Sequence, residues 1–285
     1  MGNSIMDLRR EREKYWSASR IDAFVRCPLA YAFRYILHKE PEFVPVAICL
    51  GSAVHRCQEM ATSMRAEGHP LSREDVAELF STIWCRQVRE EAREILFGEG
   101  EDIESTRLSG VAIAECFHDN VDPAEEIVAL SEAAAVPLVD GEGDVLPDPL
   151  IFEIDLVART REGEKLIVDW KSAKARWPAD KADRELQPAA YVYGYEQLHG
   201  ERLRFRYDIA IRNKTPVLQQ AYTERDDEST VRFVELIKIV SQLTEIGPEV
   251  FWPNHHSFTC PTCGYQDACA RWHRERSRFA ITLAA

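Results

Sequence analysis

Two short apolar runs, joined by a polar turn that contains Gly163, constrain the fold of this chain more than any other feature. They cover residues 150–159 and 165–170, and each carries one carboxylate, Asp155 in the first run and Asp169 in the second. Short runs rich in Val, Ile and Leu, bounded by turn residues, predict neighbouring strands. A charge beside such a run is costly to bury unless something pairs with it, so the pattern indicates a metal ion.

A lysine completes this pattern. Lys171 follows Asp169 by two positions, so the two side chains should point to the same face of the strand. Two carboxylates that converge on one hard cation favour Mg²⁺ or Mn²⁺. An adjacent lysine could orient an attacking water or stabilise the charge that develops on a phosphate. This set of groups would serve metal-assisted hydrolysis of a phosphodiester. The alternative is a pair of surface turns with incidental acids, which the two apolar runs argue against.

Two helical motifs suit the same chemistry. His55 follows Gly51 by four positions in a helical pattern, and a neutral imidazole is a good additional ligand for Mn²⁺. A lone histidine in a helix is most often structural, but beside the acids we expect it to bind the metal. Gln187 and Tyr191 are also four positions apart, which places the amide and the phenol on one face of a helix. They could hydrogen-bond phosphate oxygens or Lys171; the alternative is that they are ordinary polar residues of a helix surface.

The C-terminal tail contains three cysteines at the spacing of a metal-binding loop, Cys260, Cys263 and Cys269. A CxxC motif with a third cysteine shortly after it supplies three soft ligands, and a site of four needs one more. Cys27, which Pro28 follows, is the best candidate for the fourth ligand. The resulting site could hold zinc or an iron–sulfur cluster. Histidines are alternative fourth ligands and would favour zinc; they are His255, His256 and His273.

The order of the predicted elements indicates an α/β fold with a helical elaboration at its N-terminus. Helical patterns cover residues 18–38, 51–64, 72–97, 106–118 and 123–131. Short β-rich runs cover 133–139, 150–159, 165–170, 203–211 and 216–222, with a helix over 183–199 between the third and the fourth. This order predicts a sheet with that helix packed against it. A helix over 227–246 and the cysteine-rich tail follow.

We expect one domain over residues 1–285, because no Gly/Ser-rich stretch separates the halves. It would comprise a mainly helical part, 1–130, a catalytic α/β core, 131–225, and a C-terminal helix with the cysteine-rich tail, 226–285. No apolar run reaches the roughly 20 residues of a membrane span, and the N-terminus lacks the apolar stretch of a signal peptide. A cytoplasmic protein without a membrane partner is the expectation.

The net charge argues mildly against nucleic acid as a partner. The formal charge at pH 7 is -13, and phosphate binding favours basic surfaces. Net charge describes solubility rather than a local site, however, and the basic residues are clustered. The clusters are Lys171, Lys174, Arg176 and Lys181; Arg202, Arg204, Arg206, Arg212 and Lys214; and Arg271, Arg274, Arg276 and Arg278. The composition is therefore compatible with DNA as a partner.

Taken in order along the chain, these motifs resemble those of RecB-like nucleases in the PD-(D/E)XK superfamily. The branch they resemble is that of the iron–sulfur exonucleases, typified by the CRISPR-associated nuclease of spacer acquisition and the AddB nuclease domain. The matching motifs are Ser17-Ala-Ser19 with Cys27-Pro28, Gly51 with His55, Asp155 with Asp169 and Lys171, Gln187 with Tyr191, and Cys260 with Cys263 and Cys269. Each motif is weak singly, but their order makes the set specific.

The resemblance implies a restriction-endonuclease-like fold, in which a mixed central sheet is flanked by helices, with a helical N-terminal elaboration and a C-terminal cluster-binding tail. The implied ligands of one or two metal ions are His55, Asp155, Asp169 and the backbone carbonyl of Trp170. Lys171 would position the nucleophilic water, and Gln187 and Tyr191 would complete the catalytic set. The four cysteines would hold a [4Fe–4S] cluster that ties the N-terminal helix to the tail.

The chain departs from the family pattern in two places. The family usually has a glycine close before its first acid, whereas Ile151, Phe152 and Glu153 stand there in this chain. This difference could alter the shape of the DNA channel. Residues 70–130 carry no motif of the family, which leaves the selection of substrate open. The chain has no Gly-x-x-x-x-Gly-Lys-Ser/Thr motif of a motor domain, so a stand-alone nuclease of phages, prophages or CRISPR loci is expected.

The function expected from the sequence is a Mg²⁺- or Mn²⁺-dependent DNA exonuclease. Its substrate would be DNA that is single-stranded or has free ends, in repair, recombination or CRISPR-type processing, with recombination or CRISPR adaptation proteins as partners. One alternative is a non-catalytic DNA-binding or assembly protein that keeps the cluster as a staple of the fold. The intact acids and Lys171 argue against it, because a degenerate copy should have lost one of them. Another alternative is a zinc-ribbon regulator whose acids are incidental.

Overall fold

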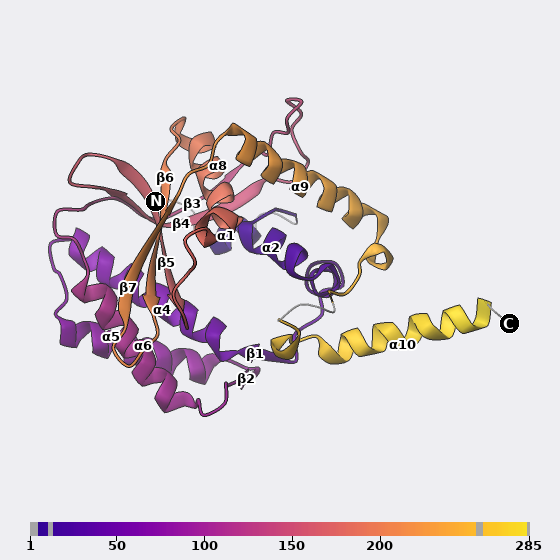
Figure 1. Cartoon of the computed structure of the whole chain (residues 1–285), viewed down its shortest axis with the longest axis horizontal. Helices are drawn as coiled ribbons and strands as arrows, with labels where there is room; N and C mark the ends of the chain where they lie inside the picture. Colours follow the sequence, from indigo (N-terminus) through magenta and orange to yellow (C-terminus); the bar gives the residue numbers. More distant parts are fainter. Residues whose placement is uncertain (1–4, 11–13, 255–258, 284–285) are drawn as a thin grey trace.

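A five-stranded mixed sheet forms the centre of the molecule. The computed structural model describes residues 5–10, 14–254 and 259–283, and Figure 1 shows its elements. The strands are, in their spatial order, β3 (Glu126–Val136), β4 (Leu150–Arg159), β5 (Lys165–Ala173), β6 (Arg204–Ile211) and β7 (Val217–Thr223). Neighbours are antiparallel except β5 and β6, which are parallel. Helix α8 (Gln187–His199) lies in the connection between these two strands. This arrangement confirms the predicted α/β fold with a mixed central sheet.

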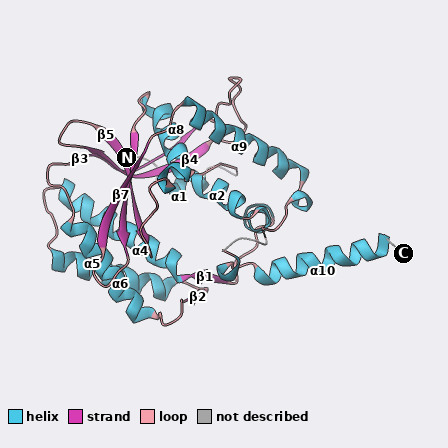
Figure 2. Cartoon of the chain, viewed as in Figure 1, coloured by secondary structure: helices cyan, strands magenta, loops and turns pink. Residues whose placement is uncertain are grey.

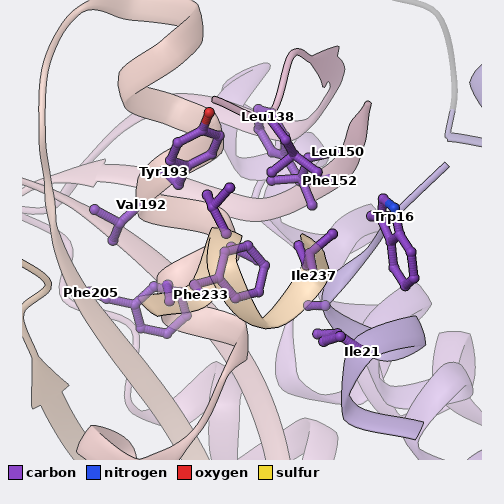
Figure 3. Close-up of a cluster of buried hydrophobic side chains, with 14 of the residues drawn as sticks. Trp16, Ile21, Leu138, Leu150, Phe152, Val192, Tyr193, Phe205, Phe233 and Ile237 are labelled. Atoms are coloured by element: carbon purple, nitrogen blue, oxygen red, sulfur yellow. The ribbon is translucent and has the colours of Figure 1, made fainter. Parts of the chain in front are cut away.

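Helices cover both faces of the sheet (Figure 1 and Figure 2). One face carries α2 (Ala18–Arg26), α8 and α9 (Asp227–Ile246). Figure 3 shows the core on this side, where Phe152 of β4, Val192 of α8 and Phe233 of α9 lie in one buried cluster. The other face carries α4 (Val46–Ala66), α5 (Arg73–Glu90) and α6 (Ile103–Asp119) over a second cluster. A sheet covered on both faces needs apolar residues at both sets of alternating positions, which explains the near-continuous apolar runs of β4 and β5.

The α/β core begins earlier than the sequence predicts. The helical pattern over 123–131 and the strand pattern over 133–139 correspond in the structure to one strand, β3. It pairs with β4 along its length, and this tertiary pairing overrides a weak helical preference. The strand therefore starts at Glu126, and the helix predicted over 123–131 is wrong from that residue on.

Two helices differ from their predicted ranges at the ends. The helix predicted over 51–64 already begins at Val46. The helix predicted over 72–97 ends at Glu90, and β2 (Glu94–Leu96) follows and pairs in parallel with β1 (Phe43–Pro45). Its start is as predicted, because Ser72 and Asp75 form a capping box. Periodicity locates the body of a helix more reliably than its ends.

The first predicted helix breaks at Cys27. Helix α2 ends at Arg26, and Cys27 is extended, with φ -161° and ψ 104°. Pro28 explains the break, because proline disfavours the α region in the residue before it. The next elements are α3 (Pro28–Tyr31) and a π-helix (Ala32–Ile36). The break brings the thiol of Cys27 to the C-terminal segment, where the backbone N–H of Asn254 donates to its sulfur (3.5 Å).

The C-terminal helix projects from the body of the molecule. Figure 1 shows α10 (Gln266–Leu283) in yellow, extending away from the sheet. Near its start, Ala268 packs with Leu29 and Phe33 in a third buried cluster. The remaining short helices are α1 (Ile5–Arg10), α7 (Lys181–Arg184), η2 (Pro248–Val250) and η3 (Cys260–Thr262). Within the described ranges, none of the helices has the length and hydropathy needed to cross a membrane.

Replacing Gly194 by Ala should destabilise the fold by about 1–3 kcal/mol. A β-carbon at this position of α8 would overlap the ring of Phe152, which is buried in β4, so helix and strand would have to move apart. Gly51→Ala is the matched control, because a β-carbon at Gly51 meets nothing within 4 Å and should stabilise α4 by about 0.5–1 kcal/mol. Chemical denaturation measures both effects. Equal stability of the two variants would contradict the close packing of α8 on β4.

Candidate active site

The two acids lie where β4 and β5 separate. The paired register of these strands ends at Leu156 opposite Val168, although both strands continue beyond this pair. Asp155 and Asp169 are the next residues on the two strands. The backbone N–H of Trp170 donates to Asp155 Oδ2 (2.9 Å), so a side chain takes the place of a ladder hydrogen bond. We call this opening between the strands the fork.

The acids reach the fork from opposite faces of the sheet. Asp155 is on the face of α4, where His55 Nδ1 lies 3.2 Å from Asp155 Oδ2. Asp169 faces α8, where Gln187 Nε2 donates to Asp169 Oδ1 (2.6 Å). Potential ligand atoms of His55, Asp155 and Asp169 all lie within 4.8 Å of one another. The separation of the strands therefore lets three groups from two faces of the sheet meet at one point.

Lys171 shares a face with Asp169, as the period of a strand predicts. Its Nζ atom lies 2.7 Å from Asp169 Oδ2, and the ammonium group is 5.7 Å from the centroid of the Tyr207 ring. The side chain of Asp169 is 1% exposed, whereas that of Lys171 is 29% exposed. The lysine thus connects the buried acid to the accessible side of the fork.

Burial and charge perturb the ionisation of these groups. Burial raises the pKa of Asp169 to about 6; Lys171 opposes this effect and Asp155 adds to it. Burial would also raise the pKa of Asp155, but His55, Lys171 and the N–H of Trp170 hold it below its usual value. Burial opposes protonation of His55, yet the charge of Asp155 and the hydrogen bond to it raise the histidine pKa. Two carboxylates in so little solvent repel each other, and a bound cation would relieve that repulsion.

The groups at the fork fit a hard divalent cation. One imidazole nitrogen and two carboxylate oxygens form a donor set that suits Mg²⁺ or Mn²⁺. The carbonyl of Trp170 should point to the same edge of β5 as its N–H, because the two groups of a strand residue share an edge, and that N–H faces Asp155. The surface beside His55 is open, since a β-carbon on Gly51, one helical turn earlier, would meet nothing within 4 Å.

A cleft of about 340 Å³ opens beside the fork. Lys171, Gln187 and Tyr191 line it, so the structure brings the lysine and the predicted amide and phenol together. Gln187 differs from the expectation in one respect, because it donates to Asp169 and not to the lysine. Burial, together with nearby acids, raises the pKa of Tyr191 well above its usual range, so its phenol remains a hydrogen-bond donor. The other residues of the cleft are Arg9, Ser17, Ala18, Ser19, Asp22, Arg26, Ile151, Phe152, Glu153, Glu185 and Leu186.

A larger cavity, of about 660 Å³, lies between α4, α6 and β7. Among the described residues it shares Trp170 with the candidate site. Part of its charged wall is paired: Arg206 Nη1 donates to Glu125 Oε1 (2.6 Å), and its Nε lies 2.9 Å from Asp208 Oδ1. The carboxylates that could bind a cation with a histidine lie at the fork instead, so we place the chemistry there.

Acids neutralise much of the basic cluster that the sequence shows near residues 202–206. Arg202 lies 2.7 Å from Glu196, Arg204 lies 3.4 Å from Glu224, and Arg206 is paired as described above. These arginines hold surface and core segments together, so they do not form the open basic surface that phosphate binding favours.

Four cysteines lie near one another where the N-terminal helices contact the tail. The backbone of Asn254 bridges two of them, because its N–H donates to Cys27 Sγ (3.5 Å) and its carbonyl accepts from Cys260 Sγ (3.5 Å). Burial raises the pKa of the Cys269 thiol, and the neighbouring Cys27, Cys263 and Cys260 raise it further. Of the alternative ligands, His255 and His256 lie outside the described residues. The structure therefore gathers the four cysteines that the sequence groups together.

Two charged residues of the cleft, Arg9 and Glu153, belong to no motif that we assigned a role from the sequence. Arg9 lies in α1, far from the acids in sequence, and no local pattern indicates its position. Glu153 carries a signal that the sequence contains, because it precedes Asp155 by two positions on a strand and should share its side. Only the tertiary structure shows that both side chains line the same cleft as Lys171.

Comparison with known proteins identifies the family and the fold. The family model of the PD-(D/E)XK nuclease superfamily matches residues 15–270. One similar solved structure is that of a protein from Eubacterium rectale, which its name describes as a candidate exonuclease. It aligns with a TM-score of 0.55 at 12% identity, over 95% of this chain and 93% of that one. At this identity the likeness shows the fold alone. The solved structure of SSO0001, also 12% identical, aligns over 85% of this chain and 93% of that one. Its TM-score is only 0.35. A search of the curated proteins finds no match.

The matched range contains every element that builds the fork. It includes α4 with His55, the strands with Asp155, Asp169 and Lys171, and α8 with Gln187. The fold and the family match agree along nearly the whole chain. The chain belongs to the PD-(D/E)XK nuclease superfamily.

Proposed function

We propose that this protein is a Mg²⁺- or Mn²⁺-dependent DNA exonuclease that takes single-stranded ends. The observation that carries the proposal is the meeting of His55, Asp155, Asp169 and Lys171 at the fork, because they come from three separate elements and only the fold brings them together. An incidental cluster of acids would not explain a lysine and a histidine held against the same carboxylates.

Each residue of the fork would have its own role in the reaction. His55, Asp155, Asp169 and the carbonyl of Trp170 would hold the cation, which when bound supplies positive charge to the scissile phosphate and lowers the pKa of water. Lys171 stays protonated, because the negative charges of Asp169 and Asp155 outweigh the effect of burial on its pKa. Its ammonium group can hold the attacking water or donate to a phosphate oxygen.

Gln187 and Tyr191 would act on either side of Lys171. The amide of Gln187 donates to Asp169 Oδ1 and so fixes the orientation of that carboxylate, which leaves Oδ2 for Lys171. The phenol of Tyr191 borders the cleft and remains protonated, so it can donate to a phosphate oxygen of the strand. Gln187 is thus a positioning residue, whereas Tyr191 would contact the substrate.

The cleft supports action on a strand end. Its volume of about 340 Å³ is near the lower limit of about 300 Å³ for ligand sites, which suits part of one strand rather than a duplex. The name of the Eubacterium rectale protein, which has a similar fold, points to an exonuclease as well. The activity would serve in DNA repair, recombination or CRISPR-type processing. The protein would then act together with other proteins of these processes.

We further propose that the four cysteines hold a [4Fe–4S] cluster that staples one nuclease domain over residues 1–285. A zinc site and a four-iron cluster each take four cysteine ligands, and Cys27, Cys260, Cys263 and Cys269 supply that number. The resemblance to the iron–sulfur exonucleases is what favours the cluster over zinc.

A cleavage assay tests the proposed function. Anaerobically purified protein is incubated with end-labelled single- and double-stranded DNA, with Mn²⁺ or Mg²⁺ or with EDTA. We expect stepwise shortening of the single strand with either metal and none with EDTA. Binding of DNA without cleavage under all conditions would contradict the proposal and would favour a non-catalytic DNA-binding protein. The same gel shows from which end digestion proceeds.

Metal binding should also be visible without activity. Adding Mn²⁺ to the EDTA-treated protein should raise its melting temperature by several degrees, because a ligand at about 100 times its Kd stabilises by about 2.7 kcal/mol. Asp155→Asn should remove most of this shift, since one of the two acids then carries no charge. Differential scanning calorimetry at constant ionic strength measures both. An equal shift in the two proteins would place the cation elsewhere.

A further inference from the structure

Glu153 is a carboxylate of the cleft that the proposed chemistry does not use. It lies on β4 two residues before Asp155, is half-buried, and borders the cleft together with Lys171. Within the part of the chain that the structure describes, no hydrogen bond or ion pair holds it. A side chain that is partly desolvated and held by no partner is costly, and a ligand in the cleft could satisfy it.

The other acids of the cleft already have partners. Asp22 lies 2.6 Å from Arg26, and Glu185 is paired with Lys181. Glu153 therefore stands out as the carboxylate of the cleft that makes no ion pair among the described residues, although the charges of Arg9 and His55 act on it.

Arg9 presents the complementary charge in the same cleft. Its guanidinium lies 5.7 Å from the centroid of the Tyr15 ring, and its buried Nε has no hydrogen-bond partner among the described residues. It makes no ion pair within the described ranges, unlike Arg26. Beyond Lys171, the cleft thus offers one cation and one carboxylate that could bind groups of a ligand.

These two groups suit different parts of a strand end. A guanidinium binds phosphate oxygens through paired N–H groups. An ionised carboxylate can only accept hydrogen bonds, so it binds a hydroxyl and repels a phosphate. A terminal phosphate monoester carries a charge of about -1.5 to -2 at pH 7, whereas a terminal hydroxyl is neutral. The cleft can therefore distinguish the two kinds of end.

We propose that this pair selects strand ends that carry a free hydroxyl: Arg9 binds the phosphodiester next to the cleaved bond, and Glu153 accepts a hydrogen bond from the terminal hydroxyl and excludes a terminal phosphate. The inference rests on the proposed exonuclease function. It specifies which chemical group the bound strand end carries. The family usually has a glycine close before its first acid, so the selection would be a feature of this chain rather than of the family.

The test compares four single-stranded oligonucleotides of one sequence, labelled internally, with hydroxyl or phosphate at the 5′ end and at the 3′ end. We expect the wild-type protein to digest the hydroxyl form at least about tenfold faster at the end that it attacks, because like charges in one cleft repel strongly. The group on the opposite end should have no effect. This comparison shows which end, 5′ or 3′, supplies the hydroxyl.

Variants assign the effect to the two residues. Glu153→Gln keeps the size of the side chain, and it should bring the ratio of the two rates close to one, mainly through faster digestion of the phosphorylated end. Arg9→Gln should raise KM for both ends and keep the ratio. Glu164→Gln is the matched control, since it removes the same charge from the exposed turn between β4 and β5 and should keep the wild-type ratio.

The outcomes separate this inference from the proposed function. A folded protein that cleaves none of the four substrates with Mn²⁺ contradicts the exonuclease itself. A wild-type protein that digests hydroxyl and phosphate ends equally, or a Glu153→Gln variant that keeps the preference, overturns the inference and leaves the exonuclease intact. A Glu153→Gln variant that needs more Mn²⁺ for half-maximal rate, with an unchanged preference, would make Glu153 a metal ligand and also overturn it.

Discussion

Asp169→Asn should lower the rate of DNA cleavage by about a thousandfold or more while the protein stays folded. The substitution keeps the size of the side chain and can keep the hydrogen bond from Gln187. It removes the negative charge that would hold the cation and the partner of Lys171, whose Nζ lies 2.7 Å away. Both the metal and the orientation of the lysine depend on that charge, so the loss should appear in kcat rather than only in KM.

The measurement is the initial rate on a single-stranded substrate at saturating Mn²⁺, with circular dichroism and thermal melting to verify the fold. Asp155→Asn and Lys171→Met should show losses of similar size, because the three groups act as a unit. Asp227→Asn is the matched control, since its side chain is 90% exposed at the start of α9. A rate within tenfold of the wild type for Asp169→Asn would place catalysis outside the fork.

Cys27→Ser or Cys263→Ser should destabilise the protein by about 2–5 kcal/mol, the range that the loss of a native disulfide costs. The reason is topological. The contacts of Cys27 with the tail, through Asn254 and the third buried cluster, join the N-terminal helices to the segment that leads into α10. Without the proposed iron–sulfur cluster, the tail would lose its attachment to the body, and α2 and α3 would lose their contact with the tail.

Absorbance and melting temperature check this prediction on anaerobically purified protein. The wild-type protein should be brown and absorb at about 400 nm, and either variant should lose the colour together with stability. Cys85→Ser is the control, because Cys85 is exposed and outside the group of four. A colourless wild-type protein that contains stoichiometric zinc would rule out the iron–sulfur cluster. Retention of both colour and stability in Cys27→Ser would remove this residue from the ligand set.

Local patterns predicted much of the fold correctly. The range of α9, the start of the helix predicted from residue 72, the strands β4 to β7 and the end of α8 at His199, before Gly200, agree with the structure within a few residues. Gly200 shows why, since its φ of 69° is a conformation that glycine adopts readily and the signal is confined to one residue. Short-range physics of this kind can be read from neighbours in the sequence.

The failures have a common cause. Residues 126–131 have a helical pattern but belong to β3, because β4 offers backbone partners along that whole stretch. The helix predicted to reach residue 97 ends at Glu90, where β2 can pair with β1. In both cases a partner distant in sequence decides the structure, and no local pattern contains that partner.

The sequence by itself determined which residues have the right chemistry: two acids on apolar strands, a lysine two positions later, a helical histidine and four cysteines. Only the tertiary structure decided how they meet. The pairing of β4 and β5 ends just before the acids, so Asp155 turns to His55 on one face while Asp169 turns to Gln187 on the other. Glu153 and Lys171 line the same cleft. A cation site needs ligands within a few ångströms, and for residues this far apart in the chain only the packing of the sheet between its two layers of helices sets that distance.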